Sequence, residues 1–271
     1  MDFTAFDFVN LTTHLDLAQV FLYVFWLFFA YLLFYLQKET RREGYPLESD
    51  ETGQLYNHGV VYMPEPKTFR MPHGHGDVSV PNDKRETREL KLTQKEPWSG
   101  APKYPSGENP MLDGIGPGAY AERADVPDLL NSGDVKIRPM RMASAFSIPD
   151  KDPNPIGSPV RGVDKEVGGT VVDVWVDQAE SVIRYYEIEV AGAVGEGEAA
   201  PRTVLMPANF AVVRNRPEQH LYVHAITGAQ FKDVPLTAKA DQITLLEEEK
   251  VMGYFGAGYL YATPNRAEPL L

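Results

Sequence analysis

Two carboxylic acids three residues apart are the strongest candidates for chemistry in this sequence. Asp177 and Glu180 lie in the stretch WVDQAE, where an alternating strand ends and a turn follows. Two carboxyl groups this close and partly desolvated do not both ionise at their ordinary pKa values, so one of them can hold a proton near neutral pH. The pair therefore predicts proton handling. The alternative is that both acids cap the turn and bind solvent.

Histidines are the other side chains whose spacing could do chemistry. His73 and His75 in PHGHG could bind a metal from a loop, but no acidic or cysteine partner stands at the spacing of a metal motif. His220 and His224 are four residues apart, which suits a metal site on a helix, yet QHLYVHAI has the pattern of a strand. We expect structural or surface roles for all four, and we predict no metal site.

The sequence carries no recognisable enzyme motif. Gly114–Gly118 is rich in glycine, but no strand precedes it and Pro117 stands where a helix would have to open, so it is not a dinucleotide-binding fingerprint. The GxSxG, Walker A and HExxH motifs are missing. The acidic run Glu247–Glu249 is most simply a solvated helix face. We therefore predict no enzymatic activity.

Composition narrows the class of protein further. The chain has 271 residues and no cysteine, which excludes a disulfide scaffold, a thiolate nucleophile and cysteine-ligated zinc or iron–sulfur sites. Lys and Arg number 26 against 38 Asp and Glu, which gives a formal net charge of −12. Because nucleic-acid-binding domains present basic surfaces, we expect no nucleic-acid partner.

One apolar segment near the N-terminus predicts a membrane anchor. Residues 17–36 contain a single polar side chain, Gln19, and no charge. At ~1.5 Å per residue, a helix of this length spans roughly 30 Å, the thickness of a bilayer core. A buried soluble helix of this length would have a polar face. A cleaved signal peptide is disfavoured, because the preceding residues carry acids without Lys or Arg and no small-residue cleavage site follows.

The charges that flank this span predict its orientation. Only acids precede it, whereas Lys38, Arg41 and Arg42 follow it. Basic residues next to a span stay in the cytoplasm. We expect the N-terminus outside the cytoplasm and residues 37–271 inside it.

The stretch after the span is rich in proline and glycine. Sixteen of the 22 prolines lie between Pro46 and Pro159, which excludes long helices and keeps any strands short. Apolar and aromatic residues nevertheless recur there, which is unlike a solvated linker. We therefore expect an extended segment that lies on a partner, as in a subunit of a complex.

From about Val160 the pattern becomes that of short strands. Thr170–Asp177 alternates, with Val172, Val174 and Val176 expected on one face of the sheet. Closely spaced strands of this kind predict a small β-barrel. Four further strands are expected, at Tyr185–Val190, Thr203–Met206, Ala211–Val213 and Leu221–Ile226.

A C-terminal helix is expected after the barrel. Thr244 and Glu247 have the spacing of a capping box, which marks a helix start. Gly253 could end this helix, because glycine is common just beyond a helix C-terminus.

These features together resemble the H subunit family of the purple-bacterial photosynthetic reaction centre. No single matching motif is specific, but their order and spacing along the whole chain are. The matching stretches are YLQ (35–37), REGYPLE (42–48), PKTF (66–69), PHG (72–74), DGIGP (113–117), KIRPM (136–140), NPIG (154–157), PVRG (159–162), VVDVWVD (171–177), TLLEEEK (244–250) and Gly253-Tyr254.

The resemblance implies a fold and a role. The implied fold is a single N-terminal transmembrane α-helix plus a cytoplasmic, mainly-β domain of the PRC-barrel type with a C-terminal helix. The helix is implied to anchor the chain beside the L and M subunits, whose quinone side the cytoplasmic part caps. The implied role is non-catalytic: to stabilise the complex and help conduct protons to the secondary quinone. Bacteriochlorophyll, bacteriopheophytin, quinones and non-haem iron are implied to sit on L and M.

The same resemblance implies the division of the chain and its location. The expected location is the chromatophore membrane of a bacterium, with antenna polypeptides, a cytochrome and membrane lipids as further candidate partners. The expected parts are a periplasmic N-terminus (1–16), a transmembrane helix (17–36), an extended region packing on partner subunits (37–158), the barrel (159–240) and the C-terminal helix and tail (241–271).

A set of proton-transfer residues carries over from the family's motifs. Asp177 and Glu180 match the acids of the family's WVDxxE motif. The chain departs from the family's pattern at one place, the proton entrance. Where some relatives have a His-Gly-His pair, this chain has Ser132-Gly133-Asp134, so Asp134 is the group there that could accept protons. The other matching positions are Asp128, Lys136, Arg184 and Glu248.

Two other hypotheses remain open from the residues alone. One is a membrane-anchored enzyme, which the missing catalytic motifs disfavour. The other is a single-span adaptor or sensor whose barrel binds a soluble partner, which the matching stretches outside the barrel disfavour.

Overall fold

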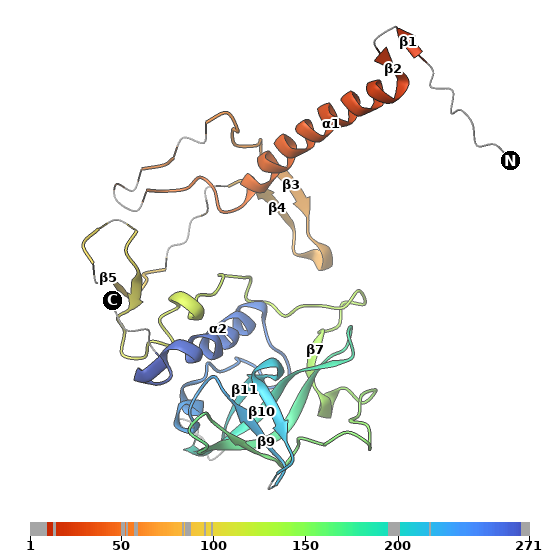
Figure 1. Ribbon diagram of the computed structural model, residues 1–271. Helices are drawn as coiled ribbons and strands as arrows, with labels where there is room; N and C mark the ends of the chain where they lie inside the picture. The colour runs from red at the N-terminus through yellow and green to blue at the C-terminus, as the bar shows by residue number, and fades with distance from the viewer. Residues whose placement is uncertain are drawn as a thin grey trace, which may run out of the picture. The chain divides into compact units, whose positions relative to one another are not determined.

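The computed structural model describes residues 10–12, 15–49, 52, 54–56, 59–82, 84, 88–94, 96–98, 100–194, 201–216 and 218–266. The chain divides into two compact units, Met1–Arg85 and Glu86–Leu271. Figure 1 traces the elements of both units.

The first unit is dominated by the apolar helix α1, Leu17–Glu39, which follows the short strands β1 (Asn10–Thr12) and β2 (Leu15–Asp16). Asp16 begins the helix with a capping box: its side chain accepts a hydrogen bond from Gln19 N at 2.7 Å, and the Gln19 side chain accepts one from Asp16 N. None of its described side chains is buried. With the turn Thr40–Arg42 it forms 26 residues, long and apolar enough to cross a membrane.

A small hairpin completes the described part of this unit. Strands β3 (Lys67–Arg70) and β4 (Asp77–Val80) pair antiparallel, joined through a loop that contains the 3-10 turn Pro72–Gly74. Nearly all of the hairpin's strand side chains are exposed, including Phe69 and Val78. This hairpin therefore has no core of its own within the unit.

The second unit is built on a seven-stranded sheet in the order β11-β10-β9-β8-β13-β12, with β7 paired to β9. Strands β8 and β13 are parallel and the other pairs are antiparallel. The strands are β7 (Ile137–Pro139), β8 (Pro159–Arg161), β9 (Val167–Asp177), β10 (Val182–Val194), β11 (Pro201–Pro207), β12 (Ala211–Arg214) and β13 (His220–Val223). Smaller elements are β5 (Leu92–Gln94), β6 (Lys103–Pro105) and the 3-10 turns Gly116–Gly118, Met140–Met142, Ala208–Phe210, Gly228–Asp233 and Pro264–Arg266.

The alternation expected in β9 is interrupted by a bulge at Val172. Glu187 of β10 pairs with Asp173 and Ile188 pairs with Val171, so Val172 has no partner in the ladder. As a result Val172 is 38% exposed while Val171 is buried. The prediction that Val172 shares one face with Val174 and Val176 was wrong for Val172, because the bulge adds a residue and interrupts the alternation of side chains between the two faces.

Helix α2, Leu245–Tyr261, packs against strand β11 and against the 3-10 turns Gly116–Gly118 and Pro264–Arg266 (Figure 1). The expected capping box is confirmed: Thr244 Oγ1 accepts from Glu247 N at 3.1 Å, and Glu247 Oε2 accepts from Thr244 N at 2.8 Å. Gly253 does not end the helix. A Cβ at Gly253 would lie 2.8 Å from the carbonyl oxygen of Gly118, so glycine is needed there for close backbone packing.

A charged network fastens the segment before the barrel to the sheet. Arg141 Nη1 donates to Asp173 Oδ2 at 2.8 Å and to Glu187 Oε2 at 2.6 Å. Glu187 Oε2 also accepts from Trp175 Nε1 at 2.9 Å. These buried acids were not singled out in the sequence, because they alternate with apolar residues as solvent-facing acids would.

Part of the Pro/Gly-rich stretch packs on this chain's own barrel and helix. Met111 and Ile137 are buried in the main hydrophobic core, and Ile115 is buried as well. That this stretch packs on partner subunits stays a prediction, and these three buried side chains show that part of it also packs within the chain. Its earlier part fits the expectation better, because its apolar side chains are exposed: Leu47, Leu55, Tyr56, Val60, Tyr62, Phe69, Met71, Val78, Leu90 and Trp98.

Candidate proton-handling site

Strand pairing places the first members of the candidate site together. Strand β7 runs antiparallel to the end of β9, and Ile137 lies opposite Asp177. Lys136 directly precedes β7, and its carbonyl oxygen accepts from Gln178 N at 3.0 Å. The basic side chain of KIRP therefore reaches the end of the strand that carries WVD.

A second bulge directs Arg184 toward the same point. Ile183 pairs with Val176 and Tyr185 pairs with Trp175, so Arg184 is left out of the β9–β10 ladder. Bulges reorient the side chain that they carry. Arg184 consequently reaches back across the turn and contacts both acids of the WVDQAE stretch.

Asp177 is completely enclosed and fully hydrogen-bonded. Its side chain is 0% exposed. Oδ1 accepts from the backbone N–H groups of Ala179 at 2.9 Å and Glu180 at 3.1 Å. Oδ2 accepts from Arg184 Nε and Nη2, both at 3.1 Å, and lies 3.7 Å from Lys136 Nζ.

These contacts keep Asp177 ionised. Burial by itself raises the pKa of this carboxyl group, but the Glu180 N–H, the Arg184 guanidinium, the Ala179 N–H and the Lys136 ammonium outweigh it, so its pKa is lowered. Asp177 is therefore not the member of the pair that this geometry favours as the proton holder. The geometry at Asp177 is that of the turn-capping alternative.

Glu180 is linked to Asp177 through Arg184. Arg184 Nη2 donates to Glu180 Oε2 at 2.7 Å, and this ion pair is largely exposed. The cation between the two carboxylates offsets their repulsion, which is why proximity alone does not raise the pKa of Asp177. The prediction that the two acids lie close together is consistent with this arrangement.

Lys136 extends the network to Asp128. Its Nζ donates to Asp128 Oδ2 at 3.1 Å. This hydrogen bond, together with the charges of Asp177 and Asp128, raises the pKa of Lys136 despite its partial burial. Lys136 is therefore a fixed positive charge between one buried and one partly exposed acid.

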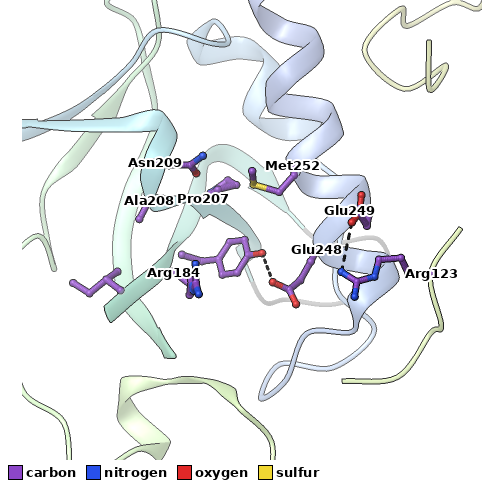
Figure 2. A pocket seen from close by; sticks show the side chains of 10 residues that line it. Arg123, Arg184, Pro207, Ala208, Asn209, Glu248, Glu249 and Met252 are labelled. Carbon is purple, nitrogen blue, oxygen red and sulfur yellow. Dashed lines mark hydrogen bonds and ion pairs between the residues drawn. The ribbon is translucent and has the colours of Figure 1, made fainter. Parts of the chain in front are cut away.

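Glu248 is the acid whose environment favours the protonated form. It lies on α2, and its Oε2 accepts a hydrogen bond from Tyr185 Oη at 2.7 Å, the contact drawn to Glu248 in Figure 2. Burial raises the pKa of Glu248, and the negative charge of Asp128 raises it further. The Tyr185 hydrogen bond and the charges of Arg184 and Arg123 oppose this change without cancelling it.

Glu248 borders an open pocket of about 490 Å³ between β10, the 208–210 turn and α2 (Figure 2). On the same pocket Arg123 Nη1 lies 3.7 Å from Glu249 Oε1. A half-buried acid such as Glu248, beside a pocket that admits water, can exchange protons with solvent. The lining residues are Arg123, Ile183, Arg184, Tyr185, Pro207, Ala208, Asn209, Glu248, Glu249 and Met252.

Asp134 stands apart from the other six candidate residues. It is exposed, and its Oδ2 accepts a hydrogen bond from Ser132 Oγ at 2.8 Å. Within the described residues it forms no ion pair with Lys136 or Arg184. The other six share direct contacts or mutual electrostatic influence around Asp177 and Glu248.

Two side chains of the site were not foreseen. Tyr185 was assigned only to a strand, and Arg123 carried no motif. Their roles depend on how α2 lies against β10 and the segment before β7, which no local spacing reveals. The network of Tyr185 and Glu248 joins residues far apart in the chain.

The described histidines are not grouped as ligands of a metal ion. Among the described residues, no group of three or more His, Asp or Glu side chains is arranged to hold a metal ion. His73 and His75 are exposed on the β3–β4 loop, and His220 Nδ1 contacts the carbonyl oxygen of Glu218.

Comparison with protein families gives two matches that follow one another along the chain. The model of the photosynthetic reaction centre H-chain N-terminal region matches residues 9–142. The model of the PRC-barrel domain matches residues 150–230. The matches and the structure confirm the expected fold class of one apolar N-terminal helix, a mainly-β domain and a C-terminal helix. The chain therefore belongs to the family of H subunits of the photosynthetic reaction centre.

Proposed function

We propose that this chain caps the cytoplasmic, quinone side of the L and M subunits and helps conduct protons to the secondary quinone. As a family member, it is a structural subunit of a photosynthetic reaction centre, anchored in the membrane. In this proposal it is not a catalyst, and the pigments, quinones and non-haem iron sit on L and M. Its N-terminus faces the periplasm, as the Lys and Arg residues after the span favour.

Exposed apolar side chains support the capping role. Among the described residues of the first unit, eight large apolar side chains between Leu47 and Val78 are exposed, and the β3–β4 hairpin is too small to bury them. Apolar surface of this kind in a membrane-anchored protein marks an interaction site. We assign this surface to contact with L and M.

The observation that carries the proton role is the contact between Glu248 and Tyr185. Glu248 is a half-buried carboxylic acid with a raised pKa, and it borders a pocket. A carboxyl group with a raised pKa keeps its proton to higher pH than an ordinary one, whereas Asp177, with its lowered pKa, gives its proton up more readily. Glu248 is therefore the proton-holding group in this proposal.

The ion network around Asp177 has a different role in the same proposal. Asp177, Arg184 and Lys136 keep fixed charges beside Glu248, and the charge of Arg184 limits how far the pKa of Glu248 rises. Glu180 and Asp128 form the exposed ends of the network, where solvent protons arrive. Asp134 lies on the exposed loop before Lys136 and collects protons nearer the surface.

Flash kinetics of the assembled complex test the proposal. Glu248→Gln removes the titrating group but keeps an acceptor for Tyr185. We expect it to slow the proton-coupled second reduction of the secondary quinone several-fold after paired flashes, while the first charge separation is unchanged. Azide, a small weak acid that carries protons by diffusion, restores part of the rate.

Glu249→Gln is the matched control, because Glu249 lines the same pocket one residue away and pairs with Arg123 instead. It leaves the second reduction near the wild-type rate. Equal rates in wild type and Glu248→Gln would remove Glu248 from the proton route. Loss of the complex itself in Glu248→Gln would assign this residue to assembly.

A further inference from the structure

A second pocket, of about 580 Å³, lies between residues 140–155 and the barrel strands β9, β10 and β12. Its size falls in the range of small-molecule sites, roughly 300–1,000 Å³. Most of its lining is aliphatic, aromatic or proline. The lining residues are Met140, Ala145, Phe146, Ser147, Ile148, Pro149, Asp152, Pro153, Pro155, Val174, Val176, Ser181, Val182, Ile183, Tyr186 and Val213.

Tyr186 contributes a hydroxyl group to this pocket that has no partner. Tyr186 is only 9% exposed, and it lies opposite Val174 in the β9–β10 ladder. No residue in the described part of the chain forms a hydrogen bond with Tyr186 Oη. Among the described residues, the fully enclosed side-chain N or O atoms without a partner are Arg138 Nε and Arg202 Nε, so the Tyr186 hydroxyl oxygen stays accessible to solvent or a ligand.

Three other tyrosines of this unit have hydrogen-bond acceptors for their hydroxyl groups. Tyr185 Oη donates to Glu248 at 2.7 Å, Tyr254 Oη donates to the carbonyl oxygen of Gln230 at 2.8 Å, and Tyr222 Oη donates to that of Val163 at 3.2 Å. Burial raises the pKa of Tyr186, so its hydroxyl remains a protonated donor. The Tyr186 hydroxyl is therefore an unused hydrogen-bond donor in a mostly apolar lining, in which Ser147 and Ser181 are exposed hydroxyl-bearing residues.

The charge of the lining restricts what can occupy the pocket. Asp152 is its one charged side chain among the sixteen lining residues. An anion would meet this carboxylate without a compensating cation, so fatty acids and phosphates are disfavoured. An uncharged molecule meets no such cost.

We propose that this pocket binds a neutral, mainly apolar small molecule that carries one carbonyl or ether oxygen, and that this oxygen accepts the hydrogen bond of Tyr186 Oη. The apolar walls bury the body of the molecule, and Tyr186 orients it. This site is separate from the proton-handling network, since Tyr186 and Tyr185 are neighbours on a strand and point to opposite faces.

Photolabelling with benzophenone tests the proposal on the assembled complex in lipid nanodiscs. Benzophenone is neutral and apolar, its carbonyl can accept the Tyr186 hydrogen bond, and under ultraviolet light it forms covalent bonds to nearby C–H groups. We expect saturable labelling of peptides that contain residues 140–149 or 182–186, read by mass spectrometry. Diphenylmethane, which lacks the carbonyl, competes about fivefold more weakly than unlabelled benzophenone, as expected for one lost hydrogen bond.

Three variants separate the hydrogen bond from general partitioning. Tyr186→Phe lowers labelling about fivefold and abolishes the preference for benzophenone over diphenylmethane. Tyr222→Phe, the matched control, leaves both unchanged, because the Tyr222 hydroxyl already has an acceptor. Ala145→Trp places a large side chain on the exposed rim and blocks labelling without altering the core.

Three results would overturn the proposal. The first is equal labelling in wild type, Tyr186→Phe and Ala145→Trp. The second is labelling spread along α1 with no saturable component at the pocket, which would mean that the probe only partitions into lipid and that water satisfies Tyr186. The third is labelling in the isolated full chain that disappears in the complex, which would assign the pocket to a partner subunit.

Discussion

Replacing Asp177 with asparagine should destabilise the barrel through one identifiable set of contacts. Asparagine keeps a side-chain oxygen that can accept from Ala179 N and Glu180 N. The asparagine amide nitrogen replaces Oδ2, so two charge-assisted hydrogen bonds from Arg184 are lost. The amide N–H groups would then face the guanidinium N–H groups of Arg184, and both are donors. Lys136 also loses an anion 3.7 Å away.

The size of this loss follows from burial. Removing one partner of a fully buried ion pair costs about 3–5 kcal/mol. Here Asp177 is fully buried but Arg184 is 41% exposed and regains water, so we expect a smaller loss of about 2–3 kcal/mol. For a chain of this size that lowers the melting temperature by roughly 5–10 °C.

Thermal melts of the full chain in detergent, followed by circular dichroism, measure this effect. Glu180→Gln is the matched control, because it removes an acid from the same arginine at the exposed end and should cost less than about 1 kcal/mol. Because the pKa of Asp177 is lowered in the folded state, its contribution to the free energy of unfolding is present above pH 3.8 and is lost as pH falls through the folded-state pKa. The difference in melting temperature between wild type and Asp177→Asn should therefore narrow in acid. A loss in Asp177→Asn no larger than that in Glu180→Gln would refute this reasoning.

Four further predictions concern other parts of the chain. The pKa of Glu248 is raised above 4.5, so its protonated form adds stability that is fully present below pH 4.5 and is lost as pH rises through the folded-state pKa. The melting temperature of Glu248→Gln should therefore rise relative to that of wild type as pH increases. A difference in melting temperature that stays constant with pH would contradict this prediction. Gly253→Ala should destabilise by about 1–3 kcal/mol in denaturant melts, although alanine normally favours helices, because its Cβ meets the Gly118 carbonyl; a stabilised variant would disprove the close packing. Backbone amide hydrogens of the β3–β4 hairpin should exchange quickly in the isolated full chain and slowly in the assembled complex, whereas those of β9 and β10 should exchange slowly in both. A hairpin that is already protected in the isolated chain would argue against the capping surface. In intact cells, a membrane-impermeant maleimide should label Thr4→Cys and spare Thr52→Cys, since the chain has no cysteine of its own; labelling of the second alone would reverse the orientation.

The features that sequence predicted well are those set by local chemistry. Helix α1 follows from an uninterrupted apolar run, and the start of α2 follows from Thr244 and Glu247, whose side chains reach only the adjacent turn. The closeness of Asp177 and Glu180 follows from three residues of spacing. Each of these depends on contacts within a few residues.

The features that sequence missed depend on contacts across the fold. The bulge at Val172 shifts the buried face of β9, and the bulge at Arg184 places a guanidinium between two acids. Gly253 was mistaken for a helix end because its partner, Gly118, is distant in the chain. For the same reason Glu248 was expected on a solvated face, and its partner Tyr185 was not recognised.

Infrared difference spectroscopy tests the central claim, that Glu248 is the group that holds and releases a proton when the secondary quinone is reduced. The light-minus-dark spectrum of the assembled complex should contain a C=O band of a protonated carboxylic acid that shifts in D₂O. The account predicts that this band disappears in Glu248→Gln and persists in Glu249→Gln and Glu180→Gln. A band that survives in Glu248→Gln and vanishes in Glu180→Gln would contradict it.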